Sequence, residues 1–190
     1  MLAFSPFRKI VRRAQPGETA LLAYLRQAAL WCADMPGRSP DTIAAFLDRI
    51  PDIEPALVEE GRYFVADNGR EILGGAGWSP LGPDVRAWLF GEHNRASHPD
   101  CGGEAVLIRG FFLQDRSGLR VGLSLMAEVQ AEAMRAGFGS AEVIAPVALQ
   151  DSFLSMGFRV HCRLEFGAGE EPVQLVHMRK AFTTALSEAA

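Results

Sequence analysis

Cysteine is scarce in this chain, and long apolar runs and an excess of positive charge are missing altogether. The 190 residues include three cysteines, an odd number for a disulfide framework, so a reducing, cytoplasmic environment is expected. No stretch reaches the roughly 20 apolar residues that a membrane helix needs, and no signal peptide is evident. The net charge of −4 argues against a nucleic-acid surface. Neither a membrane nor a nucleic acid is therefore expected as a partner.

What the chain does contain is the composition of a globular domain. Hydrophobic residues make up 48% of the sequence and charged residues 22%, a ratio that permits a substantial core. No internal repeat, low-complexity tract or linker divides it. Residues 1–190 are predicted to form a single domain.

Hydrophobic periodicity predicts an alternation of strands and helices. An Asn-Gly turn at 68–69 joins two apolar runs and predicts a hairpin, and the glycines of the second run predict a bulge or a close backbone approach. A helix starting at 16–18 is predicted to have Leu21, Leu25, Ala28 and Cys32 on one face. Strands are predicted at 7–14, 62–66, 72–78, 108–113, 141–145, 158–166 and 173–180, and further helices at 39–50, from 118 to about 136, and at 147–156. Residues 80–104 fit no element and are expected to form a long loop.

The stretch 108–122 organises the rest of the chain. An apolar strand passes into a short polar segment with a glycine, and a helical stripe begins at once at Gly122, Met126, Val129 and Ala133. The first turn of a helix has backbone N–H groups without partners and a partial positive charge. A loop of small residues at such a point is suited to a phosphate or pyrophosphate.

In their order and spacing these segments resemble the GNAT superfamily of acyltransferases. The residues 12–18 look like the family's opening, 63–78 like its second and third strands, 141–158 like its fifth strand and following helix, and 176–180 like its last strand. The resemblance covers nearly the whole chain. It implies an α/β fold with a mixed, mostly antiparallel central sheet flanked by helices, in which the fourth strand splays from the fifth.

The same resemblance implies a function. The family moves an acyl group from coenzyme A to an amine, so acetyl-CoA or another acyl-CoA is the expected co-substrate, and a primary amine on a small molecule or peptide the expected acceptor. An acyl-CoA-binding sensor with weak or no turnover is the alternative. A homodimer is possible, as is common in the family.

The family signature Q/R-x-x-G-x-G/A matches positions 117–122, with two departures. Ser117 stands at the first, long polar position, and Arg120 replaces the central glycine, whereas Gly122 is kept. The Arg120 side chain either crowds the pyrophosphate or points outward and pairs with a phosphate oxygen. By resemblance the coenzyme contacts are Phe111, Phe112, Leu113, Arg116, Ser117, Gly118, Leu119, Arg120, Val121, Gly122 and Phe153.

Phe153 stands where family members often have a tyrosine that protonates the leaving thiolate, and a strand N–H near Leu113 is the candidate donor to the thioester oxygen. The catalytic residues stay unassigned, with Ser152, Glu92 and His93 as candidates. No metal site is predicted, because the ligand types at 93, 98 and 101 lack a familiar spacing. His161 and His177 fall in strand patterns and are expected to be face residues rather than ligands.

Overall fold

The computed structural model of the protein describes residues 10–32, 53–81, 105–114, 118–166 and 172–182, together with positions 39, 41 and 44. Its helices are α1 (Thr19–Cys32), α3 (Pro55–Glu59), α5 (Leu119–Arg135) and α6 (Gln150–Ser155), with short 3-10 turns η1 (Pro16–Glu18) and η3 (Val147–Leu149). Its strands are β1 (Ile10–Arg13), β2 (Tyr63–Asp67), β3 (Ile72–Pro80), β4 (Ala105–Leu113), β5 (Ser140–Pro146), β6 (Arg159–Phe166) and β7 (Val173–Ala181). None of the described helices is long and apolar enough to cross a membrane.

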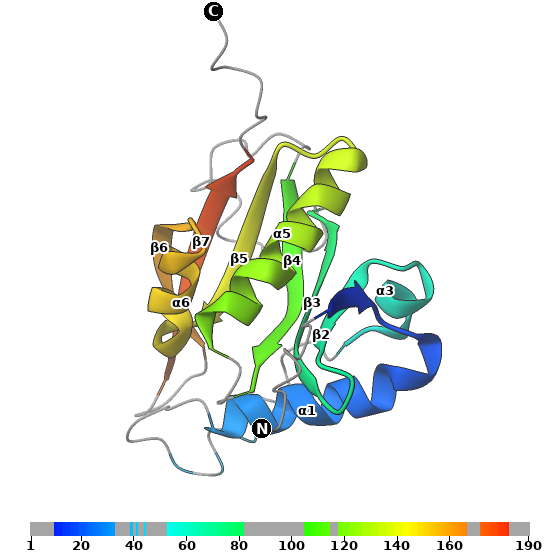
Figure 1. Cartoon of the computed structure of the whole chain (residues 1–190). Coiled ribbons are helices and arrows are strands. Elements are labelled where there is room, and N and C mark those ends of the chain that lie inside the picture. Colours follow the sequence, from blue (N-terminus) through cyan, green and yellow to red (C-terminus); the bar gives the residue numbers. More distant parts are fainter. Residues whose placement is uncertain are drawn as a thin grey trace, which may run out of the picture.

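The strands form one seven-stranded sheet in the order β1-β2-β3-β4-β5-β7-β6 (Figure 1). Each neighbouring pair is antiparallel except β4 and β5, which are parallel. This confirms the predicted mixed, mostly antiparallel sheet. The last two strands are not in chain order, since β7 lies between β5 and β6.

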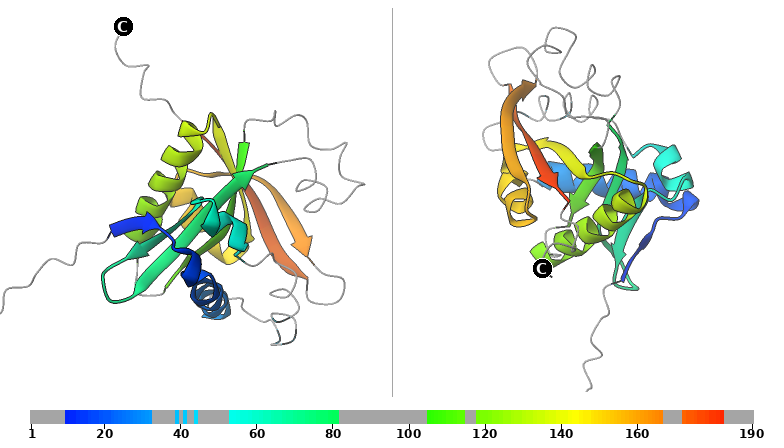
Figure 2. Two further views of the ribbon diagram at one scale, coloured as in Figure 1. Left: turned by 90° about the vertical axis from the view of Figure 1, so that its right-hand side faces the viewer. Right: turned by 90° about the horizontal axis from the view of Figure 1, so that it is seen from above.

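Helices cover both faces of the sheet (Figure 2). The larger core lies under α5 and α6 and includes Leu125 and Val129 of α5 and Phe153 of α6. The smaller core, on the other face, joins Leu22 of α1 to Leu57 of α3. Because alternate residues of a strand point to opposite faces, β2, β3 and β4 contribute to both cores.

A fully buried tyrosine explains the glycines of β3. A Cβ added at Gly77 would lie 2.6 Å from Cδ2 of Tyr63, and one at Gly75 would lie 2.8 Å from its hydroxyl oxygen. The ring therefore occupies the space that side chains at these two positions would need. The Tyr63 hydroxyl donates a hydrogen bond of 2.6 Å to the carbonyl oxygen of Gly110 in β4. The sequence predicts a bulge or a close backbone approach at these glycines; the register with β4 does shift between Gly75 and Gly77, and the group that fills the space beside them is the Tyr63 side chain.

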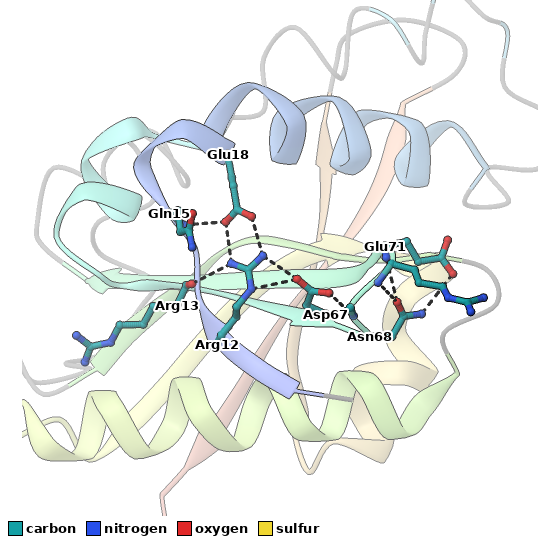
Figure 3. A network of polar contacts seen from close by, with 9 residues as sticks. Arg12, Arg13, Gln15, Glu18, Asp67, Asn68 and Glu71 are labelled. Atoms are coloured by element: carbon teal, nitrogen blue, oxygen red, sulfur yellow. Dashed lines mark hydrogen bonds and ion pairs between the residues drawn. The ribbon is translucent and has the colours of Figure 1, made fainter. Parts of the chain in front are cut away.

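An ion-pair network fixes the first strand to the hairpin (Figure 3). The Arg12 guanidinium donates to both carboxylate oxygens of Glu18, at 2.7 and 2.9 Å, and to Asp67, at 2.8 and 3.1 Å. Glu18 also accepts the backbone N–H of Gln15. The hydrogen bonds from Arg12 lower the pKa of Glu18, and those from the Gly69 N–H and Arg12 lower the pKa of Asp67. The opening segment is therefore held by charge as well as by packing.

The predicted elements from 53 onward appear where the sequence placed them, within a few residues. The face of α1 needs correction, because Leu22 is the buried residue whereas Leu21 is exposed. The helix expected at 39–50 and the loop at 80–104 lie almost entirely outside the described residues. The single-domain organisation over 1–190 stays a prediction.

Candidate functional site

The parallel strands β4 and β5 separate after a short paired segment, as the resemblance implies. They pair over three positions only, from Ala105 opposite Ser140 to Leu107 opposite Glu142. Beyond these pairs β4 continues to Leu113 with no partner on this side among the described strands. Figure 1 shows the two strands close together at the top and diverging toward the bottom, where α5 begins.

A bulge in β4 lies at this separation. Arg109 pairs with Gly77 and Phe112 with Gly75, so β4 has two residues where β3 has one. The extra residue leaves Gly110 at a φ of 58°, which a residue with a side chain rarely adopts. A bulge bends its strand, which directs the end of β4 away from β5.

A backbone donor at the end of β4 faces the gap. The N–H of Gln114 is bonded to the carbonyl oxygen of Leu73 in β3, at 2.9 Å. Because successive N–H groups of an extended strand point to opposite sides, the N–H of Leu113 points away from β3 and toward the gap.

The first turn of α5 begins at the open end of this gap. Its N-cap is Gly118, at a φ of 70°, with no side-chain cap, and no acidic residue lies in the first turn. Gly118, Leu119 and Arg120 are exposed. Within the described part of the chain no hydrogen bond satisfies the N–H groups of Leu119 and Arg120. This helix end therefore offers donors and positive potential that no carboxylate of its own turn neutralises.

The next two positions of the signature are buried and hold the helix close to β4. Val121 lies in the larger core. A Cβ added at Gly122 would lie 3.2 Å from Cδ1 of Leu113 and 3.3 Å from Sδ of Met156. Gly122 thus permits tight packing of α5 on the sheet, as the sequence predicts.

The aromatic residues assigned to the coenzyme site do not share one surface. Phe111 and Phe153 are packed together in the larger core, with ring centroids 4.8 Å apart, whereas Phe112 lies in the smaller core on the opposite face. The side chains of Phe111, Phe112 and Leu113 therefore do not form one ligand-binding surface, and these positions share only their backbone groups at the gap. Phe153 is fully buried and also contacts Phe158.

Several predicted site residues lie outside the described part of the chain. These are Arg116 and Ser117 of the signature and the candidates Glu92 and His93. Ser152 is half-buried in the first turn of α6. The described residues therefore bring the end of β4 and the start of α5 to one gap, and leave the proton-transfer groups unplaced.

The chain matches known proteins by structure but not by sequence. No family model matches the chain, and no curated protein matches it by sequence. Among solved structures, a Streptococcus pneumoniae acetyltransferase of the GNAT family covers 92% of this chain and 99% of its own, at 15% identity and a TM-score of 0.57. The chain has the GNAT fold.

Two other solved structures resemble the chain over a similar length. A Salmonella typhimurium protein solved with its cofactor acetyl-CoA covers 96% of this chain and 99% of its own, at 15% identity and a TM-score of 0.59. A polyamine N-acetyltransferase from Drosophila melanogaster, which forms N-acetylagmatine, covers 91% and 99% at 15% identity and a TM-score of 0.57. The predicted fold is confirmed.

Proposed function

We propose that the protein is an acyl-CoA-dependent N-acyltransferase that transfers acetyl from acetyl-CoA to a primary amine by direct attack. The observation that carries the proposal is the convergence of two features at one place. The separated strands β4 and β5 provide a gap with unused backbone groups, and the uncapped, exposed start of α5 provides anion donors at its open end. A long ligand with a diphosphate at one end and an amide-bearing arm fits both.

The first turn of α5 would bind the diphosphate of the coenzyme. The backbone N–H groups of Leu119 and Arg120 would hold the diphosphate, with Gly118 keeping the approach open. A cation in the first turn opposes the helix macrodipole, so Arg120 is unfavourable there unless it serves an anion outside the helix. Since its side chain is exposed, we assign it to a phosphate oxygen rather than to a clash with the pyrophosphate.

The chemistry at the other end of the gap relies on the backbone. Acetyl-CoA, when bound, supplies the activated thioester carbon that the neutral amine attacks. The N–H of Leu113 would donate to the oxygen on which negative charge develops. Holding the amine beside this position would contribute much of the rate, and a water molecule would accept the proton of the amine. As the new C–N bond forms, the thioester C–S bond would break, and coenzyme A would leave as a thiolate that takes up a proton from solvent. The overall charge of −4 favours the approach of a cationic amine.

A specific observation also supports the second candidate, an acyl-CoA-binding sensor with little turnover. Phe153 occupies the position of the family's tyrosine, carries no proton to donate, and is fully buried. A cytoplasmic location and a homodimeric state of the protein stay predictions.

Ligand-dependent stability tests the binding step. Acetyl-CoA at about 100 times its Kd is expected to stabilise the protein by about 2.7 kcal/mol, and ATP is expected to do so far less. Gly122→Trp should weaken binding, because its side chain would enter the contact between Leu113 and Met156. Gly139→Trp, beyond the other end of α5 in open space, is the matched control. Equal binding by both folded variants would show that the site is misplaced.

Free-thiol release then separates the enzyme from the sensor. The panel contains agmatine, spermidine, single amino acids and short peptides, each with acetyl-CoA. Release above the no-amine rate with any of them supports the transferase. Saturable acetyl-CoA binding with no release on the whole panel supports the sensor, and no binding at all refutes both.

A further inference from the structure

A second group of reactive side chains lies on strands that the proposed coenzyme site does not use. His161 and Cys162 of β6 face His177 of β7, and their ligand atoms all lie within 4.8 Å of one another. His161 is exposed, Cys162 half-buried and His177 fully buried. The three side chains form what is called here the His2Cys cluster.

A β-bulge brings the cluster together. Val160 pairs with Met178 and Cys162 pairs with His177, so β6 contains one extra residue, His161, between these pairs. In a regular strand adjacent side chains point to opposite faces, and 161 and 162 could not meet the same partner. A bulge re-aims a side chain, and here the imidazole rings of His161 and His177 lie 5.1 Å apart at an angle of 81°.

The buried histidine is oriented as a metal ligand usually is. Nε2 of His177 lies 2.7 Å from Oε2 of Glu142, and both side chains are almost completely buried. Nδ1 of the same ring lies 3.7 Å from Sγ of Cys162. A carboxylate on one imidazole nitrogen makes the other a better ligand and fixes its direction. Arg179 pairs with the second oxygen of Glu142, Nε to Oε1 3.2 Å, which balances the charge of that carboxylate.

The distances suit a small tetrahedral ion. With Zn–S near 2.3 Å and Zn–N near 2.0 Å, the S-to-N edge of a tetrahedron is about 3.5 Å. The Sγ–Nδ1 distance of 3.7 Å is only about 0.2 Å longer than this edge. The exposed His161 closes the remaining distance by a side-chain rotation. We infer that His161, Cys162 and His177 form a Zn²⁺ site with a fourth position open to solvent.

The composition of the cluster favours a borderline-soft ion such as Zn²⁺ over Mg²⁺ and Ca²⁺. Two imidazoles and a thiolate are borderline-soft ligands that suit Zn²⁺ and exclude Mg²⁺ and Ca²⁺, which prefer oxygen. A cysteine nucleophile with His177 as its base is the other chemistry that these residues suggest. Metal titration distinguishes the two, because only a metal site gives a Co²⁺ spectrum that depends on both Cys162 and His161.

Metal titration of the full-length protein tests the site. The purified, chelator-treated chain is expected to bind one equivalent of Zn²⁺, and Co²⁺ in its place is expected to give a thiolate charge-transfer band and intense tetrahedral visible bands. Cys162→Ser should abolish the charge-transfer band. His161→Asn, at an exposed position, should weaken Zn²⁺ binding at least about tenfold. Glu142→Gln should keep the band but lower the affinity by about 10- to 100-fold.

Cys32→Ser, which removes a thiol in α1, is the control and should leave the stoichiometry and the Co²⁺ spectrum unchanged. Circular dichroism without metal establishes that each variant is folded before it is titrated. Binding that is unaltered by Cys162→Ser and His161→Asn would place the metal elsewhere and overturn the inference, as would no binding by the folded wild-type chain. Neither result bears on acetyl-CoA binding, which is measured separately.

Discussion

Replacing Gly77 with alanine is expected to destabilise the protein by about 1–3 kcal/mol, the usual cost of overpacking a core. The new Cβ would lie 2.6 Å from Cδ2 of Tyr63 and 3.1 Å from the carbonyl oxygen of Arg62. Tyr63 cannot easily yield, because it is fully buried and its hydroxyl is bonded to Gly110 in the neighbouring strand. For a chain of this length the thermal midpoint should fall by roughly 2–12 °C.

Calorimetry and urea titration measure this change, and Gly139→Ala provides the matched control. A Cβ at Gly139 would have no neighbour within 4 Å, so that variant should lie within about 0.5 kcal/mol of wild type. The double variant Gly77→Ala, Tyr63→Leu should lose less free energy of unfolding than the sum of the two single variants, since leucine leaves room for the new Cβ. If Gly77→Ala and Gly139→Ala were equally stable, Tyr63 would not be the reason for the glycines.

Three further outcomes are expected. Glu18 and Asp67 have lowered pKa values in the folded state, so their contribution to stability is present above their unfolded pKa values and is lost as the pH falls through the folded ones. Arg12→Met should therefore cost about 1 kcal/mol at pH 7 and little at pH 2, and urea midpoints with parallel pH profiles would contradict this. Gly118→Ala should weaken acetyl-CoA binding and lower stability by about 1–2 kcal/mol, because the φ of 70° at this position is unfavourable for alanine. Isothermal titration measures the binding and urea titration the stability. Unchanged values for both would argue against the role of Gly118. Phe153→Tyr should lower stability by about 1–3 kcal/mol, because it buries a hydroxyl between aromatic rings. The rate of thiol release should not rise. A faster enzyme would mean that the ring at position 153 reaches the reacting sulfur.

The parts of the fold that could be predicted are those whose cause is local in sequence. The Asn68–Gly69 turn defines its hairpin by itself, and the stripe from Gly122 to Ala133 defines the buried face of α5. The coenzyme loop was predicted from an equally short signature, and its role stays a prediction. On α1 the prediction placed Leu25 correctly against the core but chose Leu21 instead of Leu22, because the two leucines are equally apolar and only tertiary packing distinguishes them.

The features that could not be predicted depend on residues far apart in the chain. Tyr63 and Gly110 are 47 positions apart, and no local pattern links a tyrosine to glycines in two other strands. His177 was expected to be an ordinary face residue, yet it is completely buried between Glu142 and Cys162. That arrangement requires β7 to lie between β5 and β6, and it requires a bulge at His161 that leaves no mark in the residue types.

The short pairing of β4 with β5 has a mechanical consequence. Backbone hydrogen bonds join β1 through β4 into one block and β5 through β7 into another, but among the described residues only three residue pairs of β4 and β5 connect the two blocks. The joint is held mainly by apolar side chains under α5. Substitutions in this apolar layer can change the angle between the two blocks while the strands of each block keep their register. The width of the gap between β4 and β5 can therefore change without a substitution at any residue that contacts a ligand.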